Sequence, residues 1–308
     1  MTFIKALRTI LPAEAILINE PMAKHTTFKI GGPAEILTKP ENARQIRQIR
    51  KLCRENSWPM TLLGEGSNVL VADQGVRGVV VLTTGLNKIS VDTPPDKKFG
   101  YITAGAGVKL SKLAEAACKA GLQGLEFIHA IPGSVGGAVY MNAGAYEQFI
   151  SGVCVSVTLL TDDHITDVPV SEMGFDYRTS RLQKDDGIAL EAVFRLLYGN
   201  TEEIRAKMNE LNQLRKSKHP QEPSAGSTFK NPKGHAAWEL VKNAGMTGYT
   251  VGGAMISEKH SNFAINKNNA TADDICRLLD TVRNKVHEMY GVWLEPEIKT
   301  VGHSYPWV

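Results

Sequence analysis

The stretch IPGSVGGAVYMNAGAY, residues 131–146, is rich in glycine and otherwise mostly apolar. A glycine has no Cβ, so its backbone can come very close to another group. The stretch therefore predicts close backbone approach, either to another part of the chain or to a bound ligand. The stretch carries Gly133, Gly136, Gly137 and Gly144, together with the polar residues Ser134 and Asn142.

A second glycine-rich stretch, LLGEGSNVLVAD at residues 62–73, follows a predicted strand. Gly64 and Gly66 would bare successive backbone N–H groups there, with Ser67 and Asn68 as further donors. Such a nest of donors suits a pyrophosphate, whereas the alternative is a simple hairpin turn between two strands. Two donor-rich glycine loops in one domain favour a large phosphorylated cofactor over packing alone.

Neither loop has the pattern of the common nucleotide-binding motifs. In the dinucleotide-binding fingerprint a third glycine is needed and a helix follows, but here Val69 replaces that glycine and a strand follows. The stretch AGAGVKL, residues 104–110, precedes a predicted helix and also lacks the third glycine. Neither stretch is a Walker A loop. The cofactor fold must therefore be of another kind.

Length and composition set the limits for the fold. The 308 residues are 43% hydrophobic and 22% charged, which indicates an ordinary globular protein of two or three domains. A net charge of +3 is too small to imply nucleic-acid binding, and the four scattered cysteines and eight histidines show no metal-site spacing. No apolar run approaches the ~20 residues that span a bilayer, and the N-terminus has no signal peptide pattern, so a cytoplasmic location is expected.

Hydrophobic periodicity predicts an α+β fold in three parts, namely residues 1–82, 83–198 and 199–308. The segment DTPPDKK, residues 92–98, is expected to be an exposed hairpin loop. Helices are predicted at about 41–56, 109–120, 201–216, 235–244 and 271–290, the last with Thr271 as N-cap. Strands are predicted near 60–63, 68–72, 78–82, 99–104, 153–160, 188–197, 262–267 and 293–301.

The first of these helices carries four arginines beside a helical repeat of apolar residues. The simplest interpretation is an amphipathic helix whose basic face is solvated. The arginines are Arg44, Arg47, Arg50 and Arg54, and the apolar residues are Ile46, Ile49 and Leu52.

The loop SAGSTFKNP, residues 224–232, places Ser227 between a glycine and an aromatic residue, with Lys230 close behind. No His or Asp stands in a recognisable supporting motif, so the hydroxyl of Ser227 is not expected to act as a nucleophile. Its role must be sought in the remaining motifs.

Seven motifs follow one another along the chain, namely TTFKIGGPAE, GEGSNVLV, AGAG, IPGSVGGAVYMNAGAY, DYRTS, GSTFKNP and LEPEIKTVG. They occur in the order found in the UDP-N-acetylenolpyruvoylglucosamine reductase family, which the sequence resembles over about residues 22–302. This family of flavoenzymes completes UDP-N-acetylmuramate synthesis for bacterial peptidoglycan. The short segment between the fifth and sixth motifs is similar to the second type of the family, which lacks an inserted tyrosine loop.

The resemblance implies an FAD-binding fold of the p-cresol methylhydroxylase/vanillyl-alcohol oxidase type in the first two parts and an α+β substrate domain in the third. It implies non-covalent FAD, NADPH as co-substrate, a UDP-sugar substrate and a monomer. The residues that would hold FAD are Gly64, Glu65, Gly66, Ser67 and Asn68 in the one stretch, and Pro132, Gly133, Ser134, Gly136, Gly137, Asn142 and Gly144 in the other. The catalytic residues would be Arg178, Ser227 and Glu297, and the substrate contacts Tyr177, Lys218, Asn231 and Lys299.

The implied reaction gives these residues their chemistry. NADPH reduces the flavin, and the enolpyruvyl substrate then takes a hydride at C3, which places carbanion character on C2. Arg178 stays protonated and can grip carboxylate or enolate oxygens in a bidentate way. Ser227 would protonate C2, because a carbanion is a strong enough base to accept a proton from a hydroxyl. Glu297 would either be protonated and donate a hydrogen bond to the developing enolate or, ionised, orient Arg178.

Two departures from the family pattern lie in the flavin loop, because His129-Ala130 precedes IPGSVGG in place of small residues and Glu147 follows NAGAY in place of glycine. His129 leaves open an oxidase of the same fold with covalently tethered FAD. A rival of another class is a non-enzymatic nucleotide-binding module, which would leave Arg178, Ser227 and Glu297 without a role. Lys218, in a basic cluster with Arg215 and Lys216, would contact the diphosphate or a carboxylate, whereas such a cluster is usually a solvated face.

Overall fold

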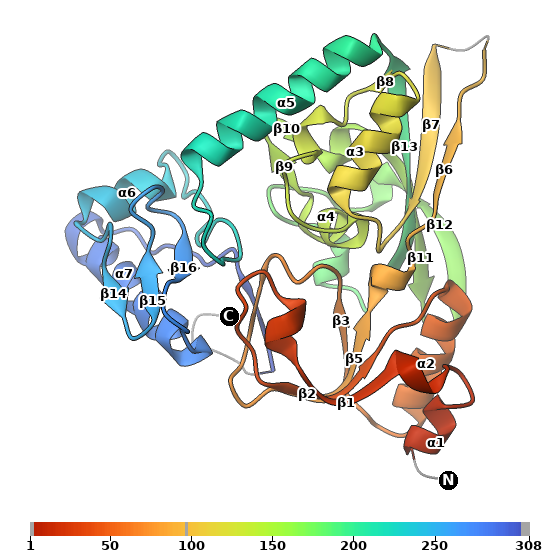
Figure 1. Cartoon of the computed structure of the whole chain (residues 1–308), viewed down its shortest axis with the longest axis horizontal. Helices are drawn as coiled ribbons and strands as arrows, with labels where there is room; N and C mark the ends of the chain where they lie inside the picture. The colour runs from red at the N-terminus through yellow and green to blue at the C-terminus, as the bar shows by residue number, and fades with distance from the viewer. Residues whose placement is uncertain (1–2, 96–97, 303–308) are drawn as a thin grey trace. The chain divides into compact units, whose positions relative to one another are not determined.

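The computed structural model of the chain describes residues 3–95 and 98–302 (Figure 1). The chain divides into two compact units, each built from separate segments, and each unit is described by itself. The expected three-part division at residues 82 and 198 stays a prediction. The first unit comprises Met1–Ile16, Thr38–Glu65 and Val81–Arg215, and the second comprises Leu17–Leu37, Gly66–Val80 and Lys216–Val308.

An antiparallel sheet is the centre of the first unit. Its strands follow the order β12-β11-β13-β7-β6, and β8 pairs with β13. Ile102 of β7 is buried between the half-buried Tyr101 and Thr103, the alternation of a strand with one face on the core. The strands are β6 (Ile89–Asp92), β7 (Phe99–Gly105), β8 (Leu122–Gln123), β11 (Cys154–Thr161), β12 (His164–Pro169) and β13 (Ile188–Tyr198).

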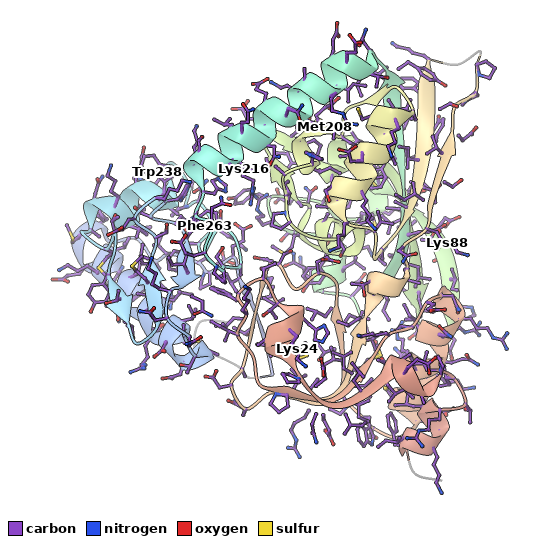
Figure 2. The ribbon with its side chains drawn as sticks, viewed as in Figure 1. Lys24, Lys88, Met208, Lys216, Trp238 and Phe263 are labelled. Carbon is purple, nitrogen blue, oxygen red and sulfur yellow. The ribbon has the colours of Figure 1, made fainter. Side chains whose placement is uncertain are left out.

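Helices complete the core of the first unit. Figure 1 shows α3 (Leu110–Lys119) and α4 (Val135–Met141) beside β7 and β13. The long helix α5 (Thr201–Lys218) adds Ile204, Leu211 and the fully buried Met208, which is labelled in Figure 2. These side chains pack with Leu113, Phe127 and Phe194 in one apolar cluster.

The helix predicted at 41–56 is α2 (Ala43–Glu55), which follows α1 (Phe3–Leu7) and leads into β3 (Met60–Leu63). The Oδ1 of Asn42 caps α2 by accepting the backbone N–H of Gln45 at 3.0 Å. The expectation of a wholly solvated basic face is wrong at one position. Arg50 is 2% exposed and lies on the buried face with Ile46 and Ile49.

The second unit packs two helices against a small antiparallel sheet. Its core includes Phe28, Leu70, Phe229 and Leu279. The N-cap predicted at Thr271 is confirmed, because Thr271 Oγ1 accepts from Asp274 N at 3.0 Å, and Asp274 completes a capping box. The sheet has the order β14-β15-β16 (Thr250–Val251, Ala254–Ile256, Ala264–Asn266), and the helices are α6 (Ala237–Asn243) and α7 (Ala272–Tyr290).

Further strands connect the segments of the second unit. β4 (Val69–Val71) pairs in parallel with β17 (Lys299–Val301), and Lys299 lies opposite Val69. Among the described residues this is a two-stranded sheet, so the alternative of a hairpin turn at residues 64–68 is wrong. The other strands run in the order β1-β2-β5 (Ile16–Pro21, Pro33–Thr38, Val76–Leu82).

Most predicted elements are confirmed, but several short strands, such as β6, β14 and β15, were not predicted. The strand expected at 293–301 is confined to β17, α4 lies unpredicted inside the glycine-rich stretch, and β12 is an unpredicted edge strand. The expected loop at 92–98 connects β6 to β7, and its residues 96–97 lie outside the described part of the chain. Within the described residues no helix is both long and apolar enough to cross a membrane.

Candidate functional site

The glycine-rich segments of the first unit lie against one another. The backbone N–H of Gly136 donates to the carbonyl oxygen of Ala106 at 2.8 Å. The Nζ of Lys109 lies 3.0 Å from the Oε2 of Glu65. Residues 104–110, for which no ligand contact is predicted, thus join the two segments for which ligand contacts are predicted.

Protein packing accounts for some of these glycines. A Cβ on Gly64 would collide with the hydroxyl of Ser134, and one on Gly136 would lie 2.9 Å from the Cβ of Ala106. Gly137 differs, because a Cβ there would meet only the Oγ of Ser134 at 3.6 Å, which is ordinary contact. Gly137 is also exposed, so its bare backbone is left open to a ligand.

Helix α4 holds this open glycine in place. Ser134 is its N-cap and accepts the N–H of Gly137 at 3.5 Å. At the other end, Asn142 adopts a left-handed conformation with φ +41°. Its buried side chain donates to Asp176 O at 3.1 Å and accepts from Ser151 N at 3.1 Å. Asn142 therefore ties the end of α4 to the turn that carries Arg178.

Arg178 lies in a tight turn of the first unit. The backbones of Asp176 and Thr179 bond to each other in both directions at 3.1–3.2 Å, and Arg178 between them has a φ of +54°. Its Nη2 donates to the carbonyl oxygen of Gly144 at 3.3 Å, and its carbonyl oxygen accepts the Nε2 of Gln183 at 2.9 Å. A left-handed arginine is strained, and such strain is found at functional sites. Tyr177 is exposed, and the centroid of its ring lies 5.1 Å from the Cζ of the Arg178 guanidinium.

In the second unit, the loop of Ser227 is bonded along both sides. On one side, the buried Thr228 donates its N–H to Asn262 O at 2.8 Å and accepts Ala264 N on its Oγ1 at 2.7 Å. Asn262 also holds the backbone of Phe229 through Oδ1 and Nδ2, at 2.9 and 2.8 Å. Two fixed residues therefore follow Ser227 directly.

The other side of the loop is bonded to the segment of Glu297. The N–H of Glu297 donates to Thr228 O at 2.8 Å. Asn68 Nδ2 donates to Glu297 O at 3.1 Å, so the segment 66–68 of the predicted flavin loop meets the glutamate. Gly226 has a φ of +77° with open space where a Cβ would stand, so backbone conformation alone calls for a glycine before Ser227.

Several charged side chains lie near the Ser227 loop and the segment of Glu297. Lys230 Nζ lies 2.6 Å from Glu295 Oε1, a pair that sequence reasoning missed because its members are 65 residues apart. Lys299 is half-buried. Its burial and the charge of Lys230 lower the pKa of Lys299, against the opposite influence of Glu295 and Glu297. The predicted residues Ser227, Glu297 and Lys299 are thus gathered in one part of the second unit.

The remaining predicted residues have simpler surroundings. Asn231 Oδ1 accepts the N–H of Ala237 at 3.0 Å, at the start of α6. Lys218 is exposed at the end of α5, next to His219, whose ring packs on Phe263 with centroids 4.8 Å apart.

Gly66 is required by packing, because a Cβ there would collide with the backbone of His25. Pro132 is exposed, Gly133 has a φ of +144° and Ser67 is half-buried.

The two departures in the flavin loop have structural counterparts. Tyr146 and Glu147 form the turn between β9 (Gly144–Ala145) and β10 (Gln148–Phe149), with φ values of +54° and +62°. Glu147 thus adopts the left-handed conformation that favours glycine. His129 is largely buried, with its Nδ1 3.9 Å from Glu115 Oε1. Across the described ranges, no group of His, Cys, Asp and Glu could hold a metal ion.

Comparison with known proteins gives these features a context. Residues 34–164 match the family "FAD binding domain", and residues 218–301 match "UDP-N-acetylenolpyruvoylglucosamine reductase, C-terminal domain". A UDP-N-acetylenolpyruvoylglucosamine reductase of Lachnoclostridium phytofermentans is 43% identical over 98% of this chain and 97% of its own. One from Caldanaerobacter subterraneus is 44% identical over 97% of both chains. The crystal structure of the Thermus caldophilus reductase superposes with a TM-score of 0.76, at 33% identity over 93% of this chain and 98% of that one.

The fold and the matched families define an FAD-dependent oxidoreductase, and the expected FAD-binding fold with an α+β C-terminal domain is confirmed. Within this class, the chain belongs to the UDP-N-acetylenolpyruvoylglucosamine reductase family. The first unit fits FAD, because Gly137 is bare, exposed and unexplained by packing at the first turn of a capped helix.

Proposed function

We propose that the protein reduces enolpyruvyl-UDP-GlcNAc to UDP-N-acetylmuramate, a peptidoglycan precursor, with NADPH as the electron donor. The observation that carries the proposal is the hydrogen bonding of the Ser227 loop to the segment of Glu297. The carbonyl oxygen of Glu297 also accepts a hydrogen bond from the side chain of Asn68, in the predicted flavin loop. A non-enzymatic binding module would have no use for this combination. Bound FAD would supply the hydride for C3 of the substrate double bond.

Arg178 would bind the carboxylate next to the double bond. Its guanidinium stays protonated at any physiological pH, and its fork of donors matches two carboxylate oxygens. The turn that bears Arg178 is held by Asn142 and Gln183, so the side chain starts from a fixed backbone. A fixed cation is worth more to a developing negative charge than a mobile one, because it needs no reorganisation during the reaction.

Ser227 would protonate C2. Its neighbours Thr228 and Phe229 are held by four hydrogen bonds to Asn262 and Ala264, so the hydroxyl projects from a rigid backbone. A proton donor must lie within hydrogen-bond reach of the atom that it protonates, and a rigid loop meets that demand better than a mobile one. The cations of Lys230 and Lys299 near this loop would stabilise the alkoxide that remains.

Glu297 would act at the same end of the substrate, either protonated, as a hydrogen-bond donor to the developing enolate, or, ionised, as a partner of Arg178. The variant Glu297→Gln separates these roles. A glutamine keeps an N–H donor but cannot carry a negative charge. Partial turnover in Glu297→Gln would therefore support the donor role, and loss equal to that of Glu297→Ala would support the ionised role.

Tyr177, Lys218, Asn231 and Lys299 would bind the UDP-sugar, with the two lysines toward its phosphates. Lys218 is exposed and so can reach an anion without losing an internal ion pair. A monomeric state and a cytoplasmic location, the compartment in which the nucleotide-sugar is made, complete the proposal.

The test is a pair of anaerobic half-reactions with the purified protein. NADPH should bleach the yellow flavin, and enolpyruvyl-UDP-GlcNAc should then restore the colour and yield a product two hydrogen atoms heavier. In D₂O that product should carry deuterium at C2. UDP-GlcNAc, which lacks the double bond, is the control and should leave the flavin reduced. Reoxidation by oxygen alone, with none by the enolpyruvyl substrate, would overturn the proposal in favour of an oxidase.

A further inference from the structure

Arg50 is an arginine inside the core of the first unit. On α2 its neighbours on the buried face are Ile46, Ile49 and Cys53, all apolar or weakly polar. Its side chain is 3% exposed, although the other three arginines of this helix face solvent. A buried guanidinium is costly unless its donors are paired, so the partners of Arg50 show what it is for.

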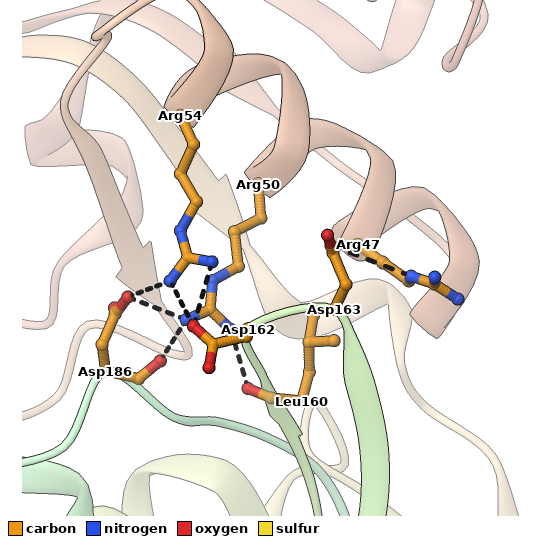
Figure 3. Close-up of polar contacts among 7 residues, drawn as sticks. All are labelled: Arg47, Arg50, Arg54, Leu160, Asp162, Asp163 and Asp186. Atoms are coloured by element: carbon orange, nitrogen blue, oxygen red, sulfur yellow. Dashed lines mark hydrogen bonds and ion pairs between the residues drawn. The ribbon is translucent and has the colours of Figure 1, made fainter.

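The guanidinium of Arg50 joins α2 to two other segments (Figure 3). Its Nη1 donates to Leu160 O at the end of β11, at 2.8 Å. Its Nη2 donates to the carbonyl oxygen of Asp186 and, at 2.8 Å, to the carboxylate Oδ2 of the same residue. Asp186 lies just before β13, whose Ile188 pairs with Leu160. Three hydrogen bonds thus fix one side chain of α2 to the end of β11 and the start of β13, two neighbouring inner strands of the central sheet.

Arg54, one turn further along α2, completes the cluster. Its Nη2 donates to Asp186 Oδ2 at 2.7 Å and to Asp162 Oδ1 at 3.3 Å. Burial raises the pKa of Asp186, but the hydrogen bonds from Arg50 and Arg54 outweigh it and keep the pKa below the usual range. Asp186 therefore stays ionised across the working pH of the protein.

Stability alone does not explain this arrangement. The Asp186 side chain is 80% exposed, and ion pairs with a solvent-exposed partner contribute little to stability, so this pair is weak evidence for a stabilising role. What the planar guanidinium supplies is direction, because its N–H donors fit acceptors only at set positions. Arg50 accordingly fixes where α2 sits on the sheet.

Both segments joined by Arg50 lead directly to the glycine-rich loops. From α2 the chain runs through β3 to Gly64 and Glu65. From Asp186 it enters β13, where Leu190 O accepts the N–H of Ala106, and Ala106 O accepts the N–H of Gly136. The position of α2 on the sheet therefore sets the spacing between one flavin loop and the other.

We propose that Arg50, Arg54 and Asp186 form an interlock that fixes the two flavin-binding segments of the first unit, and that they are positioning residues for FAD. Loosening the interlock lowers the fraction of protein whose loops are correctly spaced. The apparent dissociation constant is the intrinsic one divided by that fraction, so FAD affinity falls although no group that contacts FAD has changed.

The test measures FAD affinity and fold stability separately on the full-length chain. Arg50→Lys keeps the charge but cannot reach three acceptors, and Asp186→Asn keeps both carbonyl bonds of Arg50 but removes the charge. The matched control is Arg47→Ala on the same helix, whose exposed guanidinium lies 4.0 Å from Asp163. The readouts are fluorescence titration of flavin-stripped protein with FAD, and urea unfolding of the same flavin-free protein.

Arg50→Lys should raise the FAD dissociation constant at least about tenfold. Asp186→Asn should raise it by a smaller factor. In the control Arg47→Ala, the FAD dissociation constant should stay within about twofold of the value for the unmodified protein. The Michaelis constant for the UDP-sugar at saturating FAD should not change, since the restored holoenzyme has its loops correctly spaced. An unchanged FAD dissociation constant in Arg50→Lys, with only the urea midpoint lowered, would overturn the proposal. If Arg50→Lys does not fold, the milder Asp186→Asn decides by the same criterion.

Discussion

The backbone N–H of Glu297 donates to the carbonyl oxygen of Thr228 at 2.8 Å, so the glutamate is fixed beside the residue that follows Ser227. The two segments are 69 positions apart in the sequence. Glu297 also accepts the side chain of Asn68, which precedes β4 and lies in the predicted flavin loop. One short stretch of backbone thus links a proposed proton donor, a proposed carboxylate and a proposed cofactor contact.

Gly137→Ala should weaken FAD binding without harming the fold. The new Cβ would find 3.6 Å of space toward Ser134 within the protein, but it would occupy the surface left open to the cofactor. Alanine also favours the helix by roughly 0.5–1 kcal/mol relative to glycine. We expect the FAD dissociation constant to rise at least about tenfold in a fluorescence titration, while the flavin-free protein unfolds at an equal or higher urea concentration.

Gly136→Ala is the matched control for that variant, one residue away. Its Cβ would lie 2.9 Å from the Cβ of Ala106, so it should lower the urea midpoint. Equal FAD affinity in Gly137→Ala and the unmodified protein would show that this glycine does not face the cofactor.

Lys299 should limit substrate binding at alkaline pH. Burial and the nearby Lys230 lower its pKa, so its ammonium loses its proton at a lower pH than an ordinary lysine does. The Michaelis constant for the UDP-sugar should therefore rise as the pH increases through that lowered pKa. Lys299→Arg stays charged, and in initial-rate measurements between pH 7 and 10, roughly the range in which lysines begin to titrate, it should flatten the rise. The same rise in Lys299→Arg would remove Lys299 as its cause.

Thr228→Val should disturb the Ser227 loop through one hydroxyl. The Oγ1 of Thr228 accepts the N–H of Ala264 at 2.7 Å in a fully buried position. Valine has nearly the same shape but leaves that N–H unpaired, which costs about 1–3 kcal/mol. Urea unfolding should show this loss and turnover should fall with it. Thr228→Ser, which keeps the hydroxyl, should retain more of both, and the reverse order would contradict the role given to this bond.

Glu147→Gly should stabilise the protein. Glu147 has a φ of +62°, and a left-handed conformation costs a side-chain-bearing residue roughly 1–2 kcal/mol. Part of the gain is offset by the greater freedom of glycine in the unfolded chain, so we expect a net increase of about 0.5 kcal/mol in the free energy of unfolding. Gln148→Gly, in the adjacent strand β10, should instead destabilise. A loss of stability in both variants would show that residue 147 is not strained.

Local signals in the sequence were enough to predict many elements of the fold. The helix at 271–290 was predictable from Thr271 and the acidic first turn, because a capping box involves residues only three positions apart. Helix α4 was not predictable, since glycines are poor helix formers and its first turn, besides the Ser134 cap, depends on a bond from Gly136 to Ala106, 30 positions away. The strand expected across 293–301 is interrupted because Pro296 has no N–H to donate and Glu297 bonds to the Ser227 loop instead.

In the candidate site, too, features with a local sequence signal were predictable, whereas those that depend on distant contacts were not. Gly226 before Ser227 was a local signal, and the structure gives it the positive φ that calls for glycine. The burial of Arg50 could not be predicted, because its acceptors lie 110 and 136 positions away and its helix reads as an ordinary amphipathic one. Likewise, the spacing of glycines could not separate Gly137, which is open to a ligand, from Gly64 and Gly136, which are required by packing.

The central claim is that Ser227 delivers a proton to the substrate, and stopped-flow absorbance of the two half-reactions in Ser227→Ala tests it most directly. Flavin reduction by NADPH should keep nearly its normal rate, because that step needs no proton from the hydroxyl. Reoxidation of the reduced flavin by enolpyruvyl-UDP-GlcNAc should slow by at least roughly 10²–10⁴, the usual contribution of a positioned acid. Ser227→Cys, with its more acidic thiol, should recover part of that loss. Equal slowing of both half-reactions would contradict the claim and leave Ser227 as a residue that merely shapes the pocket.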